Sequence, residues 1–135
     1  NEEGFTLLEL IVVVAIIAIL AAVIVPQISD VRGDAKLSSV QLDLKNMKTS
    51  IEKHYLDTGS YPSDLATAGV NSAGDYYYSE SGGEYIIAYD KGGDSGGTLD
   101  DTDKLSDGNW HYISSTTSKP QTTTTASEAT TVPTP

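Results

Sequence analysis

The beginning of the chain holds one long and almost uninterrupted apolar run. From Phe5 to Val25 every residue is apolar except Thr6 and Glu9. As a helix, this run would cover roughly 30 Å, which is the thickness of the hydrocarbon core of a bilayer. The apolar region of a cleavable secretory signal is shorter, at about 7–15 residues. The run therefore predicts a helix long enough to span a membrane.

Apolar residues continue beyond this run with the spacing of an amphipathic helix. They recur at intervals of three and four residues, at Leu37, Val40, Leu44, Met47, Ile51 and Tyr55. Charged residues occupy the opposite face, and Gly59 is typical of a helix end. We therefore expect the helix to continue to about residue 57 and to lay its apolar stripe on a small head.

The region after the helix is typical of a small antiparallel sheet. Short β-like runs occupy residues 75–79, 84–90 and 109–114, and a Ser-Gly-Gly turn at 81–83 suits a hairpin. We expect three or four strands to cover Leu44, Met47 and Ile51. The remaining expected core residues are Ile86, Ile87, Trp110 and Ile113. The predicted fold class is α+β.

The last 22 residues have a composition that predicts an extended tail. From Ser114 onward, 13 of these 22 residues are Ser or Thr, and Pro120, Pro133 and Pro135 interrupt them. Such a segment lacks apolar side chains to offset the entropy of ordering, so we expect it to be mobile on a monomer. The chain contains no Asn-x-Ser/Thr sequon, so any glycan would be O-linked. The candidate acceptors are Thr122, Thr123, Thr124, Thr125, Thr130 and Thr131.

Charge and composition exclude some function classes. The net charge is −11, without the clustered Lys and Arg of nucleic-acid-binding surfaces, so we expect no nucleic-acid partner. His54 falls on the predicted helix and His111 inside a predicted strand, and neither has a nucleophile at motif spacing. We therefore expect no enzyme activity and predict that both histidines are ordinary core or surface residues.

The segment "GFTLLEL" at residues 4–10, followed by an apolar helix, an amphipathic continuation and a β-rich head, resembles the type IV pilin family, including the pseudopilins of type II secretion. The similarity runs from Gly4 to about Pro62 and includes "GSYP" after the helix. It implies that a prepilin peptidase cuts between Gly4 and Phe5, that the new amino terminus is methylated, and that Glu9 is the acidic residue of the family motif. The implied segments are the end of a leader (1–4), a transmembrane and filament-core helix (5–27), an amphipathic helix (28–57), a head (58–113) and a tail (114–135).

Glu9 is a carboxylate in an apolar segment and needs a partner. Burying it in hydrocarbon costs about 2.5–3.5 kcal/mol on insertion scales unless the charge is paired. After a cut before Phe5, the free amine of Phe5 would lie one helical turn away, and the amine of an adjacent subunit could serve equally. We interpret this pair as a register device for a helical polymer. The alternative is a carboxylate that snorkels to the lipid surface.

Pro26 lies where the apolar and amphipathic halves meet. It has no N–H to donate to the carbonyl of Ala22, and its ring collides with the preceding turn. The sequence predicts either local melting between Ala18 and Pro26 within a filament or a gentle kink. The family often has Gly where this chain has Ala18, which favours the kink.

The loop at residues 90–108 holds six aspartates, and flexible oxygen-rich loops suit Ca²⁺. The spacing is not that of an EF-hand. The loop does resemble the acidic loop of major pseudopilins, which implies calcium as a possible ligand of the head. Otherwise it is a solvated loop. The candidate ligands are Asp94, Asp100, Asp101, Asp103 and Asp107.

Two main functions follow from the resemblance. The first is the major subunit of an extracellular type IV pilus, which polymerises with itself through its apolar helix. The alternative is the major pseudopilin of a type II secretion or DNA-uptake machine, and a singly anchored binding module is a third possibility. The implied partners are other copies of the chain, the prepilin peptidase and an inner-membrane assembly platform. The subunit would lie in the inner or cytoplasmic membrane before assembly and on the cell surface afterwards.

Overall fold

The computed structural model describes residues 4–70, 74–93 and 98–133, except for the side chains of residues 26–30. The chain divides into two compact units, one ending at Asp34 and one beginning at Ala35. Each unit is described here by itself.

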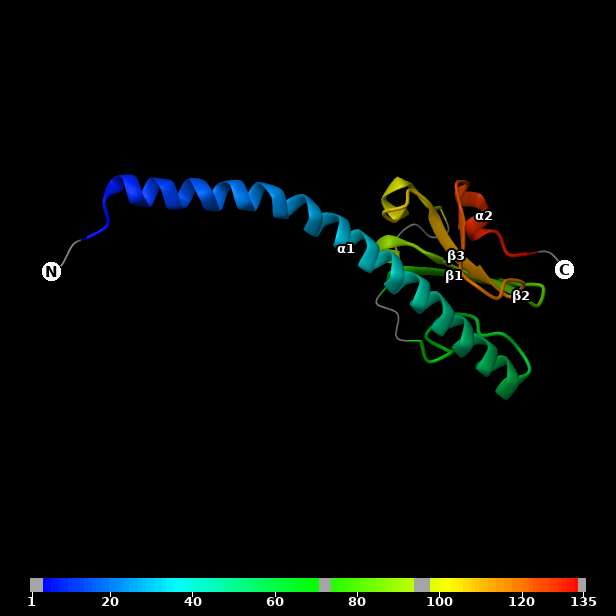
Figure 1. Ribbon diagram of the computed structural model, residues 1–135. Coiled ribbons are helices and arrows are strands. Elements are labelled where there is room, and N and C mark those ends of the chain that lie inside the picture. Colours follow the sequence, from blue (N-terminus) through cyan, green and yellow to red (C-terminus); the bar gives the residue numbers. More distant parts are fainter. Residues whose placement is uncertain (1–3, 71–73, 94–97, 134–135) are drawn as a thin grey trace. The chain divides into compact units, whose positions relative to one another are not determined.

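Helix α1 spans Leu7–Thr58, as the two consecutive hydrophobic patterns predict (Figure 1). Its first part, Leu7–Val25, is long and apolar enough to cross a membrane, and none of it is buried within the chain. Phe5, just before the helix, is 90% exposed. This part of the helix therefore has its whole apolar surface available to lipid or to other molecules.

The second half of α1 contributes one stripe to the core of the head. Val40, Leu44, Met47 and Ile51 are buried, at the predicted spacing. The helix ends before Gly59, whose positive φ of 83° suits glycine and whose N–H donates to the carbonyl of Tyr55 over 2.7 Å. The predicted end of the helix is confirmed to within two residues.

The head contains one antiparallel sheet with strands in the order β1-β2-β3-β4. The strands are β1 (Tyr76–Ser81), β2 (Glu84–Tyr89), β3 (Trp110–Ser114) and β4 (Gln121–Thr123). Gly82 and Gly83 both have positive φ and join β1 to β2 in a two-residue turn, with Ser81 opposite Glu84. The predicted α+β class, the hairpin and the three predicted strands are confirmed.

Both faces of the sheet are covered. On one face, residues of α1 pack with Tyr85, Ile87, Tyr89 and Ile113. On the other face, Ala88 and Trp110 pack with Leu99 and with Ala129 of the short helix α2 (Ala126–Thr130). Strand β2 is accordingly buried from Tyr85 to Tyr89 without alternation. The predicted core residues Ile86, Ile87, Trp110 and Ile113 are all buried.

The prediction that residues 114–135 form an extended tail is wrong for the part that the structure describes. Ser114 ends β3, residues 121–123 pair with β3 as β4, and α2 follows. Ala129 is completely buried against the second face of the sheet. Helix α2 lies over the sheet in Figure 1. The segment is ordered because small side chains such as Ala129 close an apolar face that would otherwise be exposed.

Candidate functional site

The first turn of α1 contains a reciprocal set of hydrogen bonds between Thr6 and Glu9. The Thr6 N–H donates to Glu9 Oε2 over 3.0 Å, and the Glu9 N–H donates to Thr6 Oγ1 over 3.2 Å. The Thr6 hydroxyl also donates to Glu9 Oε2, over 3.3 Å. This is a capping box, in which Thr and a Glu three residues later satisfy backbone donors that the helix leaves unpaired.

The capping box changes the interpretation of Glu9. The sequence-based alternatives for the environment of the carboxylate are an amine of the same or an adjacent subunit and snorkelling to the lipid surface. They miss the Thr-x-x-Glu signature that is visible at residues 6–9. In the intact chain the carboxylate is held at the helix start by Thr6. One Glu9 oxygen accepts both Thr6 bonds, and a carboxylate has further lone pairs that can accept from an amine. Pairing with an amine therefore stays a prediction.

Gly4 and Phe5 precede the helix and are exposed. Phe5 and Glu9 also line a shallow hollow of about 470 Å³ whose other lining residues, Leu8, Leu10, Val12 and Val13, are apolar. Six residues, 4–9, thus contain the proposed cleavage site, the proposed new amino terminus and the only carboxylate of the apolar run. The arrangement suits a site that is first processed and then buried against an apolar partner.

Pro26 lies within α1, and the helix is continuous through residues 18–26. The side chain of Pro26 lies outside the described part of the structure. The isolated chain therefore gives no melted segment here, while the behaviour predicted for a filament stays a prediction.

Within the described part of the 90–108 loop, aspartates are engaged with other groups of the protein. Asp100 caps the short helix η2 (Asp101–Asp103) by accepting from the Thr102 N–H. Buried Asp103 accepts from the N–H groups of Lys91 and Asp100, both over 2.8 Å. Asp101 pairs with Lys104 over 2.8 Å.

No three His, Asp or Glu side chains gather as a metal site within the described residues. Asp94 lies outside those residues, so the calcium prediction is untested there. The hydrogen bonds from Thr102 lower the pKa of Asp100 below its usual range. That carboxylate is therefore a stable anion at neutral pH whether or not a cation is present.

His111 is completely buried, and its Nε2 lies 2.9 Å from Asp107 Oδ2. Burial opposes ionisation of Asp107, but the bonds from His111 and from the Asn109 N–H together lower its pKa. Nδ1 of His111 is buried without a hydrogen-bond partner among the described residues. His111 is thus a core residue, as predicted. His54 lies on α1, where its carbonyl accepts from the Thr58 hydroxyl.

The six candidate glycosylation sites are not equivalent. Thr123 is buried, and its hydroxyl contacts Glu128 and the backbone at Thr125. The hydroxyls of Thr130 and Thr131 donate to carbonyls of α2. Thr122, Thr124, Thr125 and Thr131 are exposed, whereas Thr130 is half-buried. Access alone therefore favours these four exposed threonines.

The chain combines an exposed apolar helix with a head that has its own core. This combination is typical of subunits that are anchored in a membrane or that polymerise. Comparison with known proteins narrows this class. Residues 1–25 match the family described as the prokaryotic N-terminal methylation motif. The chain is 40% identical over 74 residues to a fimbrial protein of Neisseria meningitidis, an alignment that covers 55% of this chain and 44% of that protein.

Two further relatives are similar to the same extent. The type IV major pilin protein PilE of Neisseria gonorrhoeae is 40% identical over 72 residues, covering 53% of this chain and 43% of the relative. Type II secretion system core protein G of Pseudomonas aeruginosa is 40% identical over 63 residues, covering 47% and 44%. The chain spans less than half the length of these relatives. Over about half of its length the chain is therefore similar to type IV pilins and to a type II secretion core protein.

Proposed function

We propose that this protein is the structural subunit of a type IV pilus, which polymerises with itself through residues 5–25. One observation carries the proposal: the apolar helix Leu7–Val25 is wholly exposed, while the head that follows has its own closed core. Burying apolar surface contributes about 25 cal/mol for each Å², so this helix is driven out of water into lipid or against other copies. No part of the function requires catalysis.

The same segment would pass through two environments. In the membrane, the helix spans the bilayer before assembly. A prepilin peptidase then cuts between the exposed residues Gly4 and Phe5, and an inner-membrane platform adds the subunit to the growing fibre. Within the fibre, the Glu9 carboxylate meets an amine of Phe5, and the fibre emerges at the cell surface.

A second candidate function is the major pseudopilin of a type II secretion machine. The 40% identity to a type II secretion core protein supports it. The two functions differ in the filament that results, because a pilus is a long surface fibre and a pseudopilus remains short. The candidate calcium ligands and threonine glycosylation sites are compatible with either function and stay proposals.

Electron microscopy of material sheared from cells that carry the protein tests the choice. We expect long fibres that bind an antibody against the head. Sheared material without fibres, combined with secretion that fails when the gene is deleted, would favour the second function. Mass spectrometry of the subunit tests processing, and we expect an amino terminus at methylated Phe5. With Gly4→Val we expect the longer precursor to remain in the membrane.

A further inference from the structure

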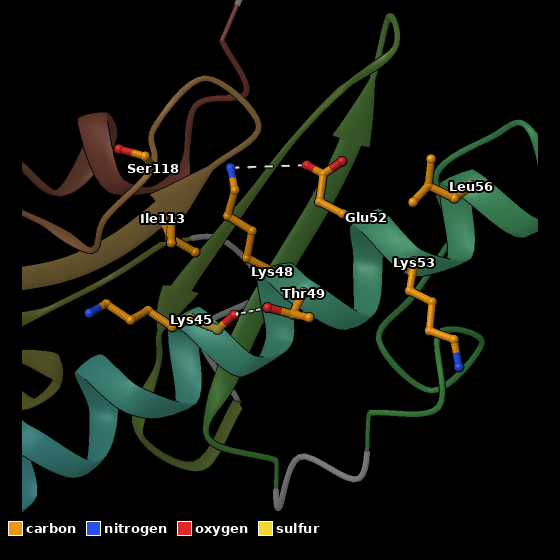
Figure 2. Close-up of a pocket in the computed structure, with 8 residues that line it drawn as sticks. All are labelled: Lys45, Lys48, Thr49, Glu52, Lys53, Leu56, Ile113 and Ser118. Carbon is orange, nitrogen blue, oxygen red and sulfur yellow. Dashed lines mark hydrogen bonds and ion pairs between the residues drawn. The ribbon is translucent and has the colours of Figure 1, made fainter.

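A groove on the head, separate from the apolar helix, is unusually basic for this protein. It has a volume of about 610 Å³ and lies between α1 and the segment around the end of β3 (Figure 2). Its lining residues are Lys45, Lys48, Thr49, Glu52, Lys53, Leu56, Ile113 and Ser118. Among the residues that the structure describes, three lysines line it, but only one acidic residue, Glu52, does.

One side of the groove is a band of side chains along α1. Residues 45, 48, 49, 52, 53 and 56 are spaced by three and four, so they form a stripe along α1. This stripe lies beside the buried stripe at Val40, Leu44, Met47 and Ile51, which packs on the sheet. The basic stripe is thus held in position by the core of the head.

Lys48 forms part of the wall of the groove and connects α1 to the segment after β3. Its Nζ donates to the carbonyls of Ser114 and Thr117, both over 2.7 Å, and lies 4.0 Å from Glu52 Oε1. These bonds fix the turn after β3 against α1. Burial lowers the pKa of Lys48, although Glu52 and Glu84 oppose that shift. We therefore treat Lys48 as structural.

Lys45 and Lys53 differ from Lys48 because both are exposed and neither forms an ion pair within the described residues. Figure 2 shows their side chains extending away from the Lys48–Glu52 pair. At the end of the stripe, Leu56 is 83% exposed. The groove thus offers two unpaired ammonium groups and an apolar contact.

We propose that this groove, through Lys45 and Lys53, receives an acidic surface of the head of a second copy of the chain. Two arguments favour a second copy. Every copy is strongly acidic, with a net charge of −11 for the given sequence and −9 once residues 1–4, which include Glu2 and Glu3, are removed. Packing many copies together is therefore opposed by their mutual repulsion unless basic groups face acidic ones. In addition, exposed carboxylates are abundant on each head, for example at Asp57 and Glu80.

The inference rests on the proposed polymer and assigns a second contact to it. The apolar helix provides most of the association, and it does not specify how the heads are rotated. A pair of charges at a fixed place on the head would favour one orientation, because a wrong orientation brings like charges together.

Cross-linking of mixed polymers tests the contact. Polymers are grown from unlabelled and ¹⁵N-labelled chains and treated with a carbodiimide, which joins amines to carboxylates in direct contact. We expect peptides that join Lys45 or Lys53 of one copy to an Asp or Glu of another, recognised by their mixed isotope content. Cross-links from these lysines only within one copy, or to a different protein, would overturn the proposal.

Charge reversal gives a second test. Lys53→Glu and Lys45→Glu are each compared with Lys91→Glu, which makes the same charge change at an exposed lysine outside the groove. We expect each groove variant to raise the critical concentration for polymerisation about fivefold, the scale of one exposed ion pair. We expect the control to change it less than twofold. Circular dichroism confirms that all three heads are folded.

The outcomes separate the two proposals. If the unaltered chain polymerises and the groove variants match the control, the groove contact is excluded while the polymer stands. If the unaltered chain, in detergent or lipid, forms no polymer under any condition that assembles known pilins, both proposals fail.

Discussion

The first part of helix α1, Leu7–Val25, is exposed, whereas its second part, which begins at Ala35, contributes to the core of the head. From Leu7 to Val25 no residue is buried, whereas Val40, Leu44, Met47 and Ile51 are buried in the head. The difference arises from the hydrophobic pattern, which is continuous in the first part and a narrow stripe in the second. A stripe can be covered by one small sheet. A helix that is apolar on all sides needs lipid or several neighbouring helices.

Removing the first part should therefore produce the largest change. We expect a chain that begins at Ala35 to fold and to remain monomeric in water, because its core lies within that unit. The full chain should require detergent or lipid, or should polymerise. Analytical ultracentrifugation with circular dichroism measures both properties. A shortened chain that still polymerises would place the main contact on the head.

Substitutions at the start of the helix separate capping from charge pairing. Glu9→Gln retains a side chain that can cap the helix but removes the charge, whereas Thr6→Ala removes the hydroxyl of the cap and retains the charge. If the carboxylate pairs with an amine of another copy, Glu9→Gln should abolish filaments, although the subunit still inserts into the membrane. Thr6→Ala should reduce helix stability by about 0.5–2 kcal/mol and leave filaments present.

Filament yield per membrane-inserted subunit is the measurement for this series. Glu9→Ala serves as the reference that loses both functions. Normal yield from Glu9→Gln, together with low yield from Thr6→Ala, would assign the role of Glu9 to capping alone.

Deleting residues 120–135 should weaken the head without abolishing its fold. The deletion exposes the face of the sheet that holds Ala88 and Trp110, on which Leu99 packs. We expect the free energy of unfolding to fall by about 2–4 kcal/mol, the scale for losing several buried groups. Urea denaturation followed by Trp110 fluorescence measures the loss. Unchanged stability would restore the original prediction of a tail that does not contribute to folding.

The sequence predicted the structure correctly where a hydrophobic pattern was compatible with only one kind of element. The period of three and four in 37–55 predicted the stripe that is buried from Val40 to Ile51, although Leu37 is only half-buried and Tyr55 is exposed. The run "EYIIAYD" predicted β2. The same run also contained a signal that was missed, because Tyr85–Tyr89 is apolar without alternation and so needs cover on both faces. An ordered cover is therefore needed on the second face, and the Thr-rich segment supplies it through Ala129 of α2, while β4 extends the sheet beside β3.

The polar contacts could not be predicted in the same way. Asp100 and Asp103 cap a turn and accept from the backbone, whereas their spacing alone is also compatible with a cation site. The attachment of Lys48 to carbonyls 66 and 69 residues later depends on long-range packing. Such contacts follow from the fold and leave no local pattern in the sequence.

High pH should weaken the head and leave the apolar helix unaffected, because the tyrosines lie in the head. Burial, followed by the bond to Glu52, raises the pKa of Tyr85, and burial also raises the pKa values of Tyr76 and Tyr78. Their folded pKa values lie above the unfolded value of 10.0. Stability should therefore be complete below about pH 10 and fall as the pH rises further. Unfolding that coincides with tyrosinate absorbance is the expected result, and a head stable at pH 12 would contradict it.

The smallest expected effect comes from a single hydroxyl between helix and sheet. Tyr85 is buried on β2, and its hydroxyl donates to Glu52 Oε1 of α1 over 2.8 Å. Tyr85→Phe retains the ring contact with Tyr61 and removes that bond, so the Glu52 carboxylate keeps Lys48, 4.0 Å away, and its interaction with Tyr61. We expect a loss of about 1–2 kcal/mol in the free energy of unfolding, the scale of a hydrogen bond to a charged group. Tyr55→Phe is the matched control, because Tyr55 is exposed and its ring also contacts Tyr61. If both variants lose the same stability in urea denaturation, the Tyr85 hydroxyl has no specific role in holding α1 on the sheet.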